Sequence, residues 1–165
     1  MIIVGIGSNL AAPGYASPLD TGLAALDALA APHFHPVACS PWYESAPVPE
    51  SDQPWFANAV ALVETEREPE FVLDWLLTVE GRFGRVRGER NAARTLDLDL
   101  IDYDGLILDT PRLTLPHPRM HERRFVLAPL CDLAPGWRHP RLGLDAAALL
   151  ARLPPGQPVR RAAVP

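Results

Sequence analysis

The sequence contains no lysine, and all fifteen of its basic residues are arginine. A phosphate-binding loop of the G-x-x-x-x-G-K-[ST] type is therefore excluded, because that loop requires a lysine. No G-x-G-x-x-G motif follows a predicted strand, since Gly5-Ile6-Gly7 is only a G-x-G, which is typical of a tight turn. These two absences exclude a P-loop or Rossmann nucleotide site.

Cysteine and long apolar runs are also scarce. Cys39 and Cys131 are the two cysteines, and they form neither a C-x-x-C pair nor a disulfide framework, which fits a reducing cytosol. No uninterrupted apolar run reaches the ~18 residues typical of a transmembrane helix. The apolar segment at residues 2–6 has no basic leader and is too short for the core of a signal peptide. We therefore expect a cytoplasmic protein with no membrane partner.

The charge distribution is uneven. A net charge of -5 and a pI near 5.5 argue against a general nucleic-acid binder, which would carry a basic surface. Nine of the fifteen arginines nevertheless fall between Arg82 and Arg124, and such a stretch can bind a small polyanion. With 165 residues, of which 48% are hydrophobic, the chain fits one globular domain, so we expect a single domain over residues 1–165 that is a monomer.

Hydrophobic periodicity predicts a β-α-β-β-α-β order of elements. The predicted strands are residues 2–7, 37–43, 56–65 and 95–103, and the predicted helices begin near Leu19 and at Pro69. This order is the split pattern of a ferredoxin-like α+β fold, in which helices pack against one face of an antiparallel sheet.

Further segments flank this core. Residues 44–54 are rich in proline and small polar residues, which predicts a long surface loop. Asp104-Gly105 predicts a hairpin turn with a return strand that begins at Ile107 and Leu108. The C-terminal part predicts short helices within residues 122–133 and 144–153.

Two aspartates stand on the last predicted core strand. Alternate residues of a strand share a face, so Leu96, Leu98 and Leu100 point to the core. Asp97 and Asp99 lie together on the other face, with their Cα atoms ~6.6 Å apart. Two like charges this close disfavour each other unless a cation lies between them. Carboxylate oxygens suit Mg²⁺, which takes one or two carboxylates and completes its shell with water and phosphate oxygens. The alternative is a solvated face of an amphipathic strand.

An arginine-rich segment precedes these aspartates. Guanidinium groups bind phosphate oxygens in a fork geometry and stay charged at any working pH. Together with the acid pair they indicate phosphoryl chemistry, although alone they are more typical of a solvated helix end and loop. The arginines of this segment are Arg82, Arg85, Arg87, Arg90 and Arg94.

Other groups of residues give weaker indications of function. The histidines show no zinc-binding motif, because the i, i+4 pair His117 and His121 straddles Pro118, and no serine lies in a G-x-S-x-G context. Aromatic pairs flank the proline-rich loop, and such rings either belong to a core or stack on a flat heterocycle. Asn58 follows this loop and offers both a donor and an acceptor to an amide-like ring edge.

The segment from Arg90 to Ile101, which contains Arg94, Asp97 and Asp99, resembles the signature of the 6-hydroxymethyl-7,8-dihydropterin pyrophosphokinase family. Further segments resemble the family in the same order along the chain, and the resemblance covers roughly residues 2–135. They are Gly7-Ser8-Asn9-Leu10, Ser40 to Pro47, Asp52-Gln53-Pro54 with Phe56 and Asn58, Glu80 to Arg87, and Leu113 to His117 with Met120, Arg123 and Phe125.

The resemblance implies transfer of diphosphate from ATP to 6-hydroxymethyl-7,8-dihydropterin, with release of AMP, in folate biosynthesis. It implies that Asp97 and Asp99 hold two Mg²⁺ ions and that Arg85 and Arg94 steady the transferring group. The residues that it implies bind ATP are Leu77, Arg87, Leu100, Arg112, Thr114, His117 and Arg123. Those that it implies for the pterin are Ser45, Ala46, Val48, Phe56, Asn58 and Phe125.

Two other classes of function share some of these residues. A pterin- or nucleotide-binding module without catalysis would keep the aromatic residues and Asn58 but would not need Arg85, Arg94, Asp97 and Asp99 together. A metal-dependent phosphohydrolase would use the same acid pair with water in place of the pterin.

Overall fold

The computed structural model describes residues 1–86 and 93–164. The elements are β1 (Ile2–Ser8), α1 (Pro18–Ala28), β2 (His35–Cys39), β3 (Tyr43–Ser45), β4 (Phe56–Glu64), α2 (Pro69–Arg82), β5 (Asp97–Tyr103), β6 (Leu108–Asp109), β7 (Thr114–Leu115), the 3₁₀ helix η1 (Met120–Glu122), α3 (Arg124–Leu133), α4 (Ala146–Ala151) and β8 (Val159–Arg161).

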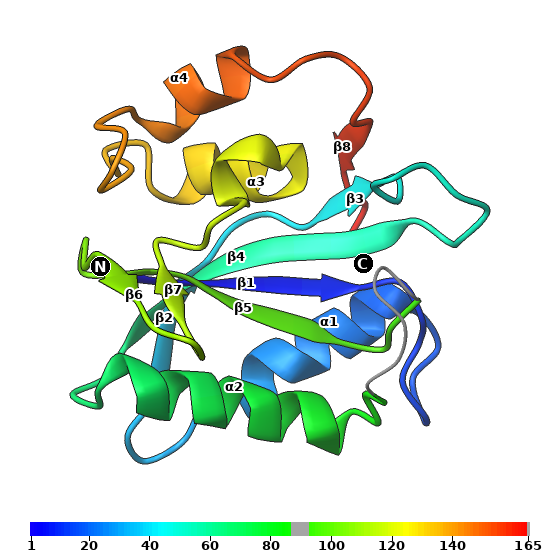
Figure 1. The fold of residues 1–165 in the computed structure, drawn as a ribbon. Coiled ribbons are helices and arrows are strands. Elements are labelled where there is room, and N and C mark those ends of the chain that lie inside the picture. The colour runs from blue at the N-terminus through cyan, green and yellow to red at the C-terminus, as the bar shows by residue number, and fades with distance from the viewer. Residues whose placement is uncertain (87–92, 165) are drawn as a thin grey trace.

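A six-stranded antiparallel sheet forms the centre of the fold (Figure 1). Its strand order is β5-β1-β4-β3-β8, and β2 also pairs with β4. The second predicted strand is present as the two pieces β2 and β3, which both lie along β4. The predicted order of strands and helices is thus found in β1 to β5, with β1 between β4 and β5.

The two helices of the predicted core, α1 and α2, pack against one face of this sheet, as the order of elements predicts, and the C-terminal helices α3 and α4 cover the other face. Ile2, Val4 and Ile6 of β1 share one core with α1 and α2. Ile3, from the opposite face of the same strand, packs into a second core with residues of α3 and α4. Figure 1 shows α1 and α2 on one side of the sheet and α3 and α4 on the other. The C-terminal helices are therefore a third layer rather than an appendage.

The predicted strand at residues 37–43 is interrupted at Ser40 and Pro41. Pro41 has no backbone N–H and cannot donate to a ladder. Ser40 compensates for this break, because its backbone N–H donates to the Val60 carbonyl at 2.9 Å and its Oγ accepts from the Val60 N–H at 3.1 Å. The chain re-enters the sheet at Tyr43, so the loop predicted at residues 44–54 begins only after Ser45.

The predicted hairpin after β5 is wrong, although its turn is present. Asp104 and Gly105 have φ angles of 50° and 71°, as a type I′ turn requires, and Leu106 N–H donates to the Tyr103 carbonyl at 2.8 Å. The return segment does not pair with β5, however. Its strand β6 instead pairs with β7 in a separate two-stranded sheet, so the extra hairpin is displaced along the chain.

Gly22 in α1 provides a test of the packing between this helix and the sheet. A Cβ atom there would lie 2.5 Å from ring atoms of Trp42, which is closer than real contacts allow. We expect Gly22→Ala to lower the free energy of unfolding by roughly 1–3 kcal/mol, even though alanine favours a helix, because overpacking outweighs propensity. Denaturation by urea measures this change.

Gly81 in α2 is the matched control, because a Cβ atom there meets nothing within 4 Å. Gly81→Ala should raise the free energy of unfolding by up to about 1 kcal/mol through helix propensity alone. Equal stabilisation by both substitutions would contradict the packing described for Trp42.

Candidate active site

The two aspartates project from β5 on the face opposite to Leu96, Leu98 and Leu100, as the alternation predicts. Leu96, Leu98 and Leu100 belong to the core shared with α1 and α2. Across the ladder, Asp97 faces Gly7 and Asp99 faces Gly5 of β1. These glycines place no side chain over the aspartates, so both carboxylates line an open cavity.

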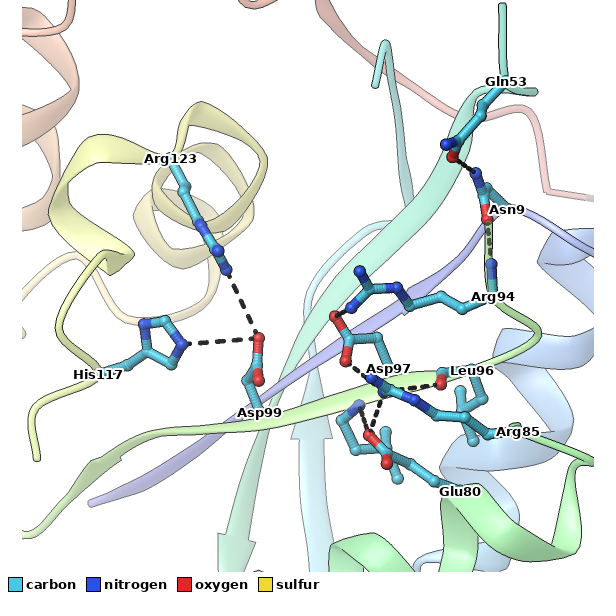
Figure 2. A network of polar contacts seen from close by, with 11 residues as sticks. Asn9, Gln53, Glu80, Arg85, Arg94, Leu96, Asp97, Asp99, His117 and Arg123 are labelled. Carbon is cyan, nitrogen blue, oxygen red and sulfur yellow. Dashed lines mark hydrogen bonds and ion pairs between the residues drawn. The ribbon is translucent and has the colours of Figure 1, made fainter. Parts of the chain in front are cut away.

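Two arginines hold the Asp97 carboxylate from the same side (Figure 2). Arg85 Nη1 donates to Oδ1 at 2.5 Å, and Arg94 Nη1 donates to Oδ2 at 2.9 Å. Arg85 Nη1 also donates to the Leu96 carbonyl at 3.1 Å and to Glu80 Oε1 at 2.8 Å. The predicted association of the acid pair with the arginine segment is therefore present in Arg85 and Arg94.

Glu80 is a buried residue of this site whose contacts the sequence does not reveal. It lies near the end of α2 and is buried, and its Oε1 accepts from the Leu98 N–H of β5 at 2.7 Å as well as from Arg85. Burial raises the pKa of Glu80 to about 7, while its hydrogen bond from Leu98 and the charge of Arg85 act in the opposite direction. Glu80 thus connects the arginine to the strand that carries both aspartates.

Asp99 has weaker partners than Asp97. Its Oδ2 lies 3.7 Å from Arg123 Nη1 and 3.8 Å from His117 Nε2, so neither group makes a short hydrogen bond to this carboxylate (Figure 2). Burial and the negative charge of Asp97 raise the pKa of Asp99 to about 6. Burial and the nearby Arg123 and Arg119 lower the pKa of His117 to about 4, so this imidazole is neutral at pH 7.

Asn9 joins two segments that border the site. It is buried, and its Oδ1 accepts from the Arg94 N–H at 2.9 Å while its Nδ2 donates to Gln53 Oε1 at 3.1 Å (Figure 2). The Asn9 and Leu10 N–H groups both donate to the Arg94 carbonyl at 3.2 Å. In the sequence Asn9 stands out only as part of a segment that carries the resemblance, and its buried amide beside Arg94 reveals the link.

One cavity gathers all the residues predicted for the pterin. It lies over β1 and β4 and is closed on one side by α3. Asn58 is buried in its wall, and its Nδ2 donates to Ser45 Oγ at 2.7 Å. The lining includes Gly5, Gly7, Ser45, Ala46, Val48, Phe56, Asn58, Arg94, Asp97, Asp99, Arg123 and Phe125.

A second cavity gathers part of the set predicted for ATP. It lies between the start of α2, β5 and the β6–β7 hairpin, and it contains Leu100, Arg112, Thr114 and His117 together with Asp99. Arg123, also predicted for ATP, instead lines the first cavity.

Leu77 and Arg112 differ from the other residues predicted for ATP, because Leu77 lies outside the second cavity, and Arg112 lines it but is already paired with two carboxylates. Leu77 does not line the second cavity, whereas Leu73, one turn earlier in α2, does. Arg112 donates to the carboxylates of Glu70 and Asp74 in α2. Arg87 lies outside the described residues.

Asp99 lines both cavities, and Asp97 lies beside it in the first. A divalent cation fits this arrangement, because burial and the negative charge of Asp97 both raise the pKa of Asp99, and a bound cation would offset both effects. Among the described residues there is no group of three or more histidine, cysteine, aspartate or glutamate side chains that could hold a metal. An ion bound here would therefore need further oxygen ligands, and Mg²⁺ commonly takes these from water and phosphate.

An acid pair between two cavities, with arginines around it, is typical of a metal-dependent phosphotransferase that brings two small molecules together. The comparisons with known proteins define this class further. The model of the family 7,8-dihydro-6-hydroxymethylpterin-pyrophosphokinase (HPPK) matches residues 3–135. The chain belongs to this family, and the resemblance seen in the sequence is confirmed.

Curated relatives agree with this assignment. The chain is 45% identical over 154 residues to the 2-amino-4-hydroxy-6-hydroxymethyldihydropteridine pyrophosphokinase of Pseudomonas aeruginosa, covering 93% of this chain and 91% of the relative. It is 43% identical over 131 residues to the enzyme of the same name from Haemophilus influenzae, covering 79% of each.

Solved structures support the fold. The wild-type HPPK-DHPS of Plasmodium falciparum matches with a TM-score of 0.64 at 12% identity over 92% of this chain. A structure titled HPPK-DHPS in complex with substrates matches with a TM-score of 0.68 at 13% identity over 91% of this chain. The chain spans less than half of these longer proteins, 44% and 42% respectively.

Glu80 can be tested by removing its acceptor. We expect Glu80→Ala to lower the free energy of unfolding by roughly 1–3 kcal/mol, because the buried Leu98 N–H loses its partner. Glu80→Gln keeps an oxygen acceptor for this N–H and should cost less. Urea denaturation of both variants gives the comparison, and equal losses would show that the Leu98 hydrogen bond is not the source of the effect.

Proposed function

We propose that this chain transfers the terminal diphosphate of ATP to the hydroxymethyl oxygen of 6-hydroxymethyl-7,8-dihydropterin, releasing AMP, as a step of folate biosynthesis. Its membership of the HPPK family supports this activity. The single structural observation that carries the proposal is the position of Asp99, which lines both cavities and stands next to the arginine-bound Asp97. Two substrates in these cavities would meet at the acid pair.

The first cavity is proposed as the pterin site. Phe56 and Phe125 come from the start of β4 and the first turn of α3, and both line this cavity, so a flat heterocycle can lie against aromatic surface. Asn58 offers an amide to the edge of such a ring, and Ser45 beside it holds the amide in place. Ala46 and Val48 complete the apolar wall.

The second cavity is proposed as the nucleotide site. Leu100 contributes apolar surface near the adenosine, and Thr114 and the neutral His117 contribute polar atoms. Arg112 and Arg123 would face the phosphates, and Leu77 and Arg87 remain in the proposed set on the strength of the family resemblance. Leu73 is added because it lines this cavity.

Asp97 and Asp99 are proposed to hold two Mg²⁺ ions together with phosphate oxygens. When bound, the ions neutralise phosphate charge and orient the attacking and leaving oxygens. Arg85 and Arg94 already lie at Asp97, so their guanidinium groups are in place to bind phosphate oxygens once the carboxylate has another partner. Glu80 and the Leu96 carbonyl keep Arg85 at the site throughout.

The reaction is an in-line displacement at the β-phosphorus of ATP. The hydroxymethyl oxygen forms the new P–O bond and loses its proton, while the bond between the β-phosphorus and the oxygen of the α-phosphate breaks and AMP leaves. The described residues contribute by positioning and by charge rather than by a covalent intermediate. We assign no side chain as a general base.

Three further properties are part of the proposal. The chain is a single domain over residues 1–165, and it acts as a monomer in the cytoplasm on its two small-molecule substrates. Its sheet is a ferredoxin-like arrangement, supported by the antiparallel order β5-β1-β4 with β2 and β3 on the outer side of β4. No helix within the described residues is long and apolar enough to cross a bilayer.

The activity itself is tested by supplying ATP, Mg²⁺ and 6-hydroxymethyl-7,8-dihydropterin and following AMP. We expect AMP to form only when the pterin is present. Formation of ADP or phosphate without AMP would instead support a metal-dependent phosphohydrolase. Binding of the pterin without any turnover would support a module that has lost catalysis.

The role of Asp97 is tested by Asp97→Ala. Loss of this carboxylate should lower turnover roughly 10³-fold, which corresponds to several kcal/mol of electrostatic stabilisation. The free energy of unfolding should change by no more than about 1 kcal/mol, because the loss of the ion pairs of Asp97 is offset by relief of its repulsion with Asp99. Asp27→Ala, which removes an exposed aspartate of α1, is the control and should leave turnover unchanged. A wild-type rate in the Asp97→Ala variant would remove this residue from the metal site.

A further inference from the structure

The last strand of the sheet lies beyond residues 3–135, which the family model matches, and it is attached to both walls of the first cavity. We call residues 157–162, which contain β8, the C-terminal strap. In Figure 1 the strap runs beside β3, on the side of the sheet that α3 covers. Proline-rich sequence surrounds it, and no strand was predicted there.

The strap holds the wall of the cavity that β3 provides. Ser45, which lines the cavity, pairs with Val159 in the ladder. Ala46, the next lining residue, donates its N–H to the Pro158 carbonyl at 3.1 Å. The chain at Ser45 and Ala46 is therefore fixed by backbone hydrogen bonds to the strap on its outer edge.

The strap also holds the opposite wall, through Gln157. The Gln157 Nε2 donates to the Glu122 carbonyl at 2.9 Å, and its Oε1 accepts from the Arg124 N–H at 2.9 Å. Helix α3 has no side-chain cap of its own at this end, so Gln157 satisfies a backbone donor that the first turn would otherwise leave open. Arg123, which faces Asp99, lies between the two residues that Gln157 contacts. Phe125, which lines the cavity, is the next residue after Arg124.

Two arginines of β8 extend these attachments. Arg160 Nε donates to Glu44 Oε2 at 2.7 Å, and its guanidinium lies 4.9 Å from the ring centroid of Trp55, the neighbour of Phe56. Arg161 Nη2 donates to both carboxylate oxygens of Asp132 in α3, at 3.0 Å each. The strap thus contacts β3, the start of β4 and α3.

The strap makes few contacts with the hydrophobic cores. Arg160 and Arg161 are exposed, Val159 is only partly buried, and Ala162 alone packs at the margin of a core. Its removal should therefore cost little of the apolar burial on which the stability of the domain depends. This separates the strap from elements such as β1, whose loss would unfold the protein.

We propose that the C-terminal strap is a positioning element for the pterin cavity and that Gln157 acts through Phe125, which lines that cavity. This rests on the proposed assignment of that cavity to the pterin. By fixing both walls before the ligand arrives, the strap lowers the cost of ordering them on binding. Its loss raises the KM for the pterin more than the KM for ATP.

Truncation tests the strap as a whole. A chain ending at Gly156 lacks every contact described above, whereas a chain ending at Ala162 keeps them all and serves as the matched control. We expect the shorter chain to raise the KM for 6-hydroxymethyl-7,8-dihydropterin about tenfold or more, a loss of about 1.4 kcal/mol per tenfold. The KM for ATP should stay within about twofold, and the longer chain should behave as the full chain.

Point variants keep the proposal testable if the shorter chain fails to fold. Gln157→Ala removes both hydrogen bonds and should raise the pterin KM, while Gln157→Glu keeps an oxygen for the Arg124 N–H and should recover part of the loss. A thermal melt of each variant shows that it is folded. A pterin KM in folded Gln157→Ala equal to that of the full chain, or a parallel rise in both KM values, would overturn the proposal.

The activity of the full chain separates failure of the proposed function from failure of the strap proposal. If it forms no pterin-dependent AMP, the proposed function fails before the strap is considered. If it forms AMP but Asn58→Ala and Phe125→Ala leave the pterin KM unchanged, the assignment of the cavity is wrong. If those substitutions raise the pterin KM and the chain ending at Gly156 does not, only the strap proposal is wrong.

Discussion

Repulsion between two carboxylates on one face of a strand is the constraint on which the site depends. Asp97 and Asp99 are two residues apart on β5, and the charge of Asp97 contributes to the raised pKa of Asp99. Arg85 and Arg94 take up both oxygens of Asp97, and Arg123 faces Asp99. In the structure the arginines stabilise the acids, and under the proposed function a cation at the acids would leave the same arginines available to phosphate. The ion pairs of the free protein and the proposed phosphate contacts are thus alternative states of the same groups.

The site is held from the other side of the sheet. Leu98 lies between the two aspartates in sequence, and its N–H donates to Glu80 of α2, which also binds Arg85. One buried carboxylate therefore couples the helix, the strand and the arginine. Asn9 plays the corresponding part at the end of β1, where it binds the backbone of Arg94 and the side chain of Gln53. Precise placement of flexible arginines requires such buried partners.

Much of this site could be predicted from the sequence because its signals are local. Alternation along β5 suffices to place the aspartates on one face, and the family resemblance names Phe56, Asn58 and Phe125, which do line one cavity. The roles of Glu80 and Asn9 were missed because they depend on contacts between segments far apart in the chain. Their only sequence signal was their place within segments that match the family.

The features of the fold that the sequence did not predict have similar causes. Helices α3 and α4 cover the second face of the sheet, and their placement depends on tertiary packing that short helical patterns do not encode. The Asp104-Gly105 turn forms, but turn chemistry alone does not decide which strand the returning chain joins. The strand β8 is three residues long and is specified by its partner β3 rather than by its own composition.

Gly5 and Gly7 leave β1 without side chains where it faces the first cavity, so at this point the sheet has a packed layer on only one side. A Cβ atom at either position would come within 3.3 Å of a neighbour, Ile101 at Gly5 and Asn58 at Gly7. A ligand in this space takes the place of the missing layer and buries backbone that water otherwise covers. Occupancy of the cavity and thermal stability are therefore linked, because a molecule that binds only the folded chain shifts the folding equilibrium by mass action.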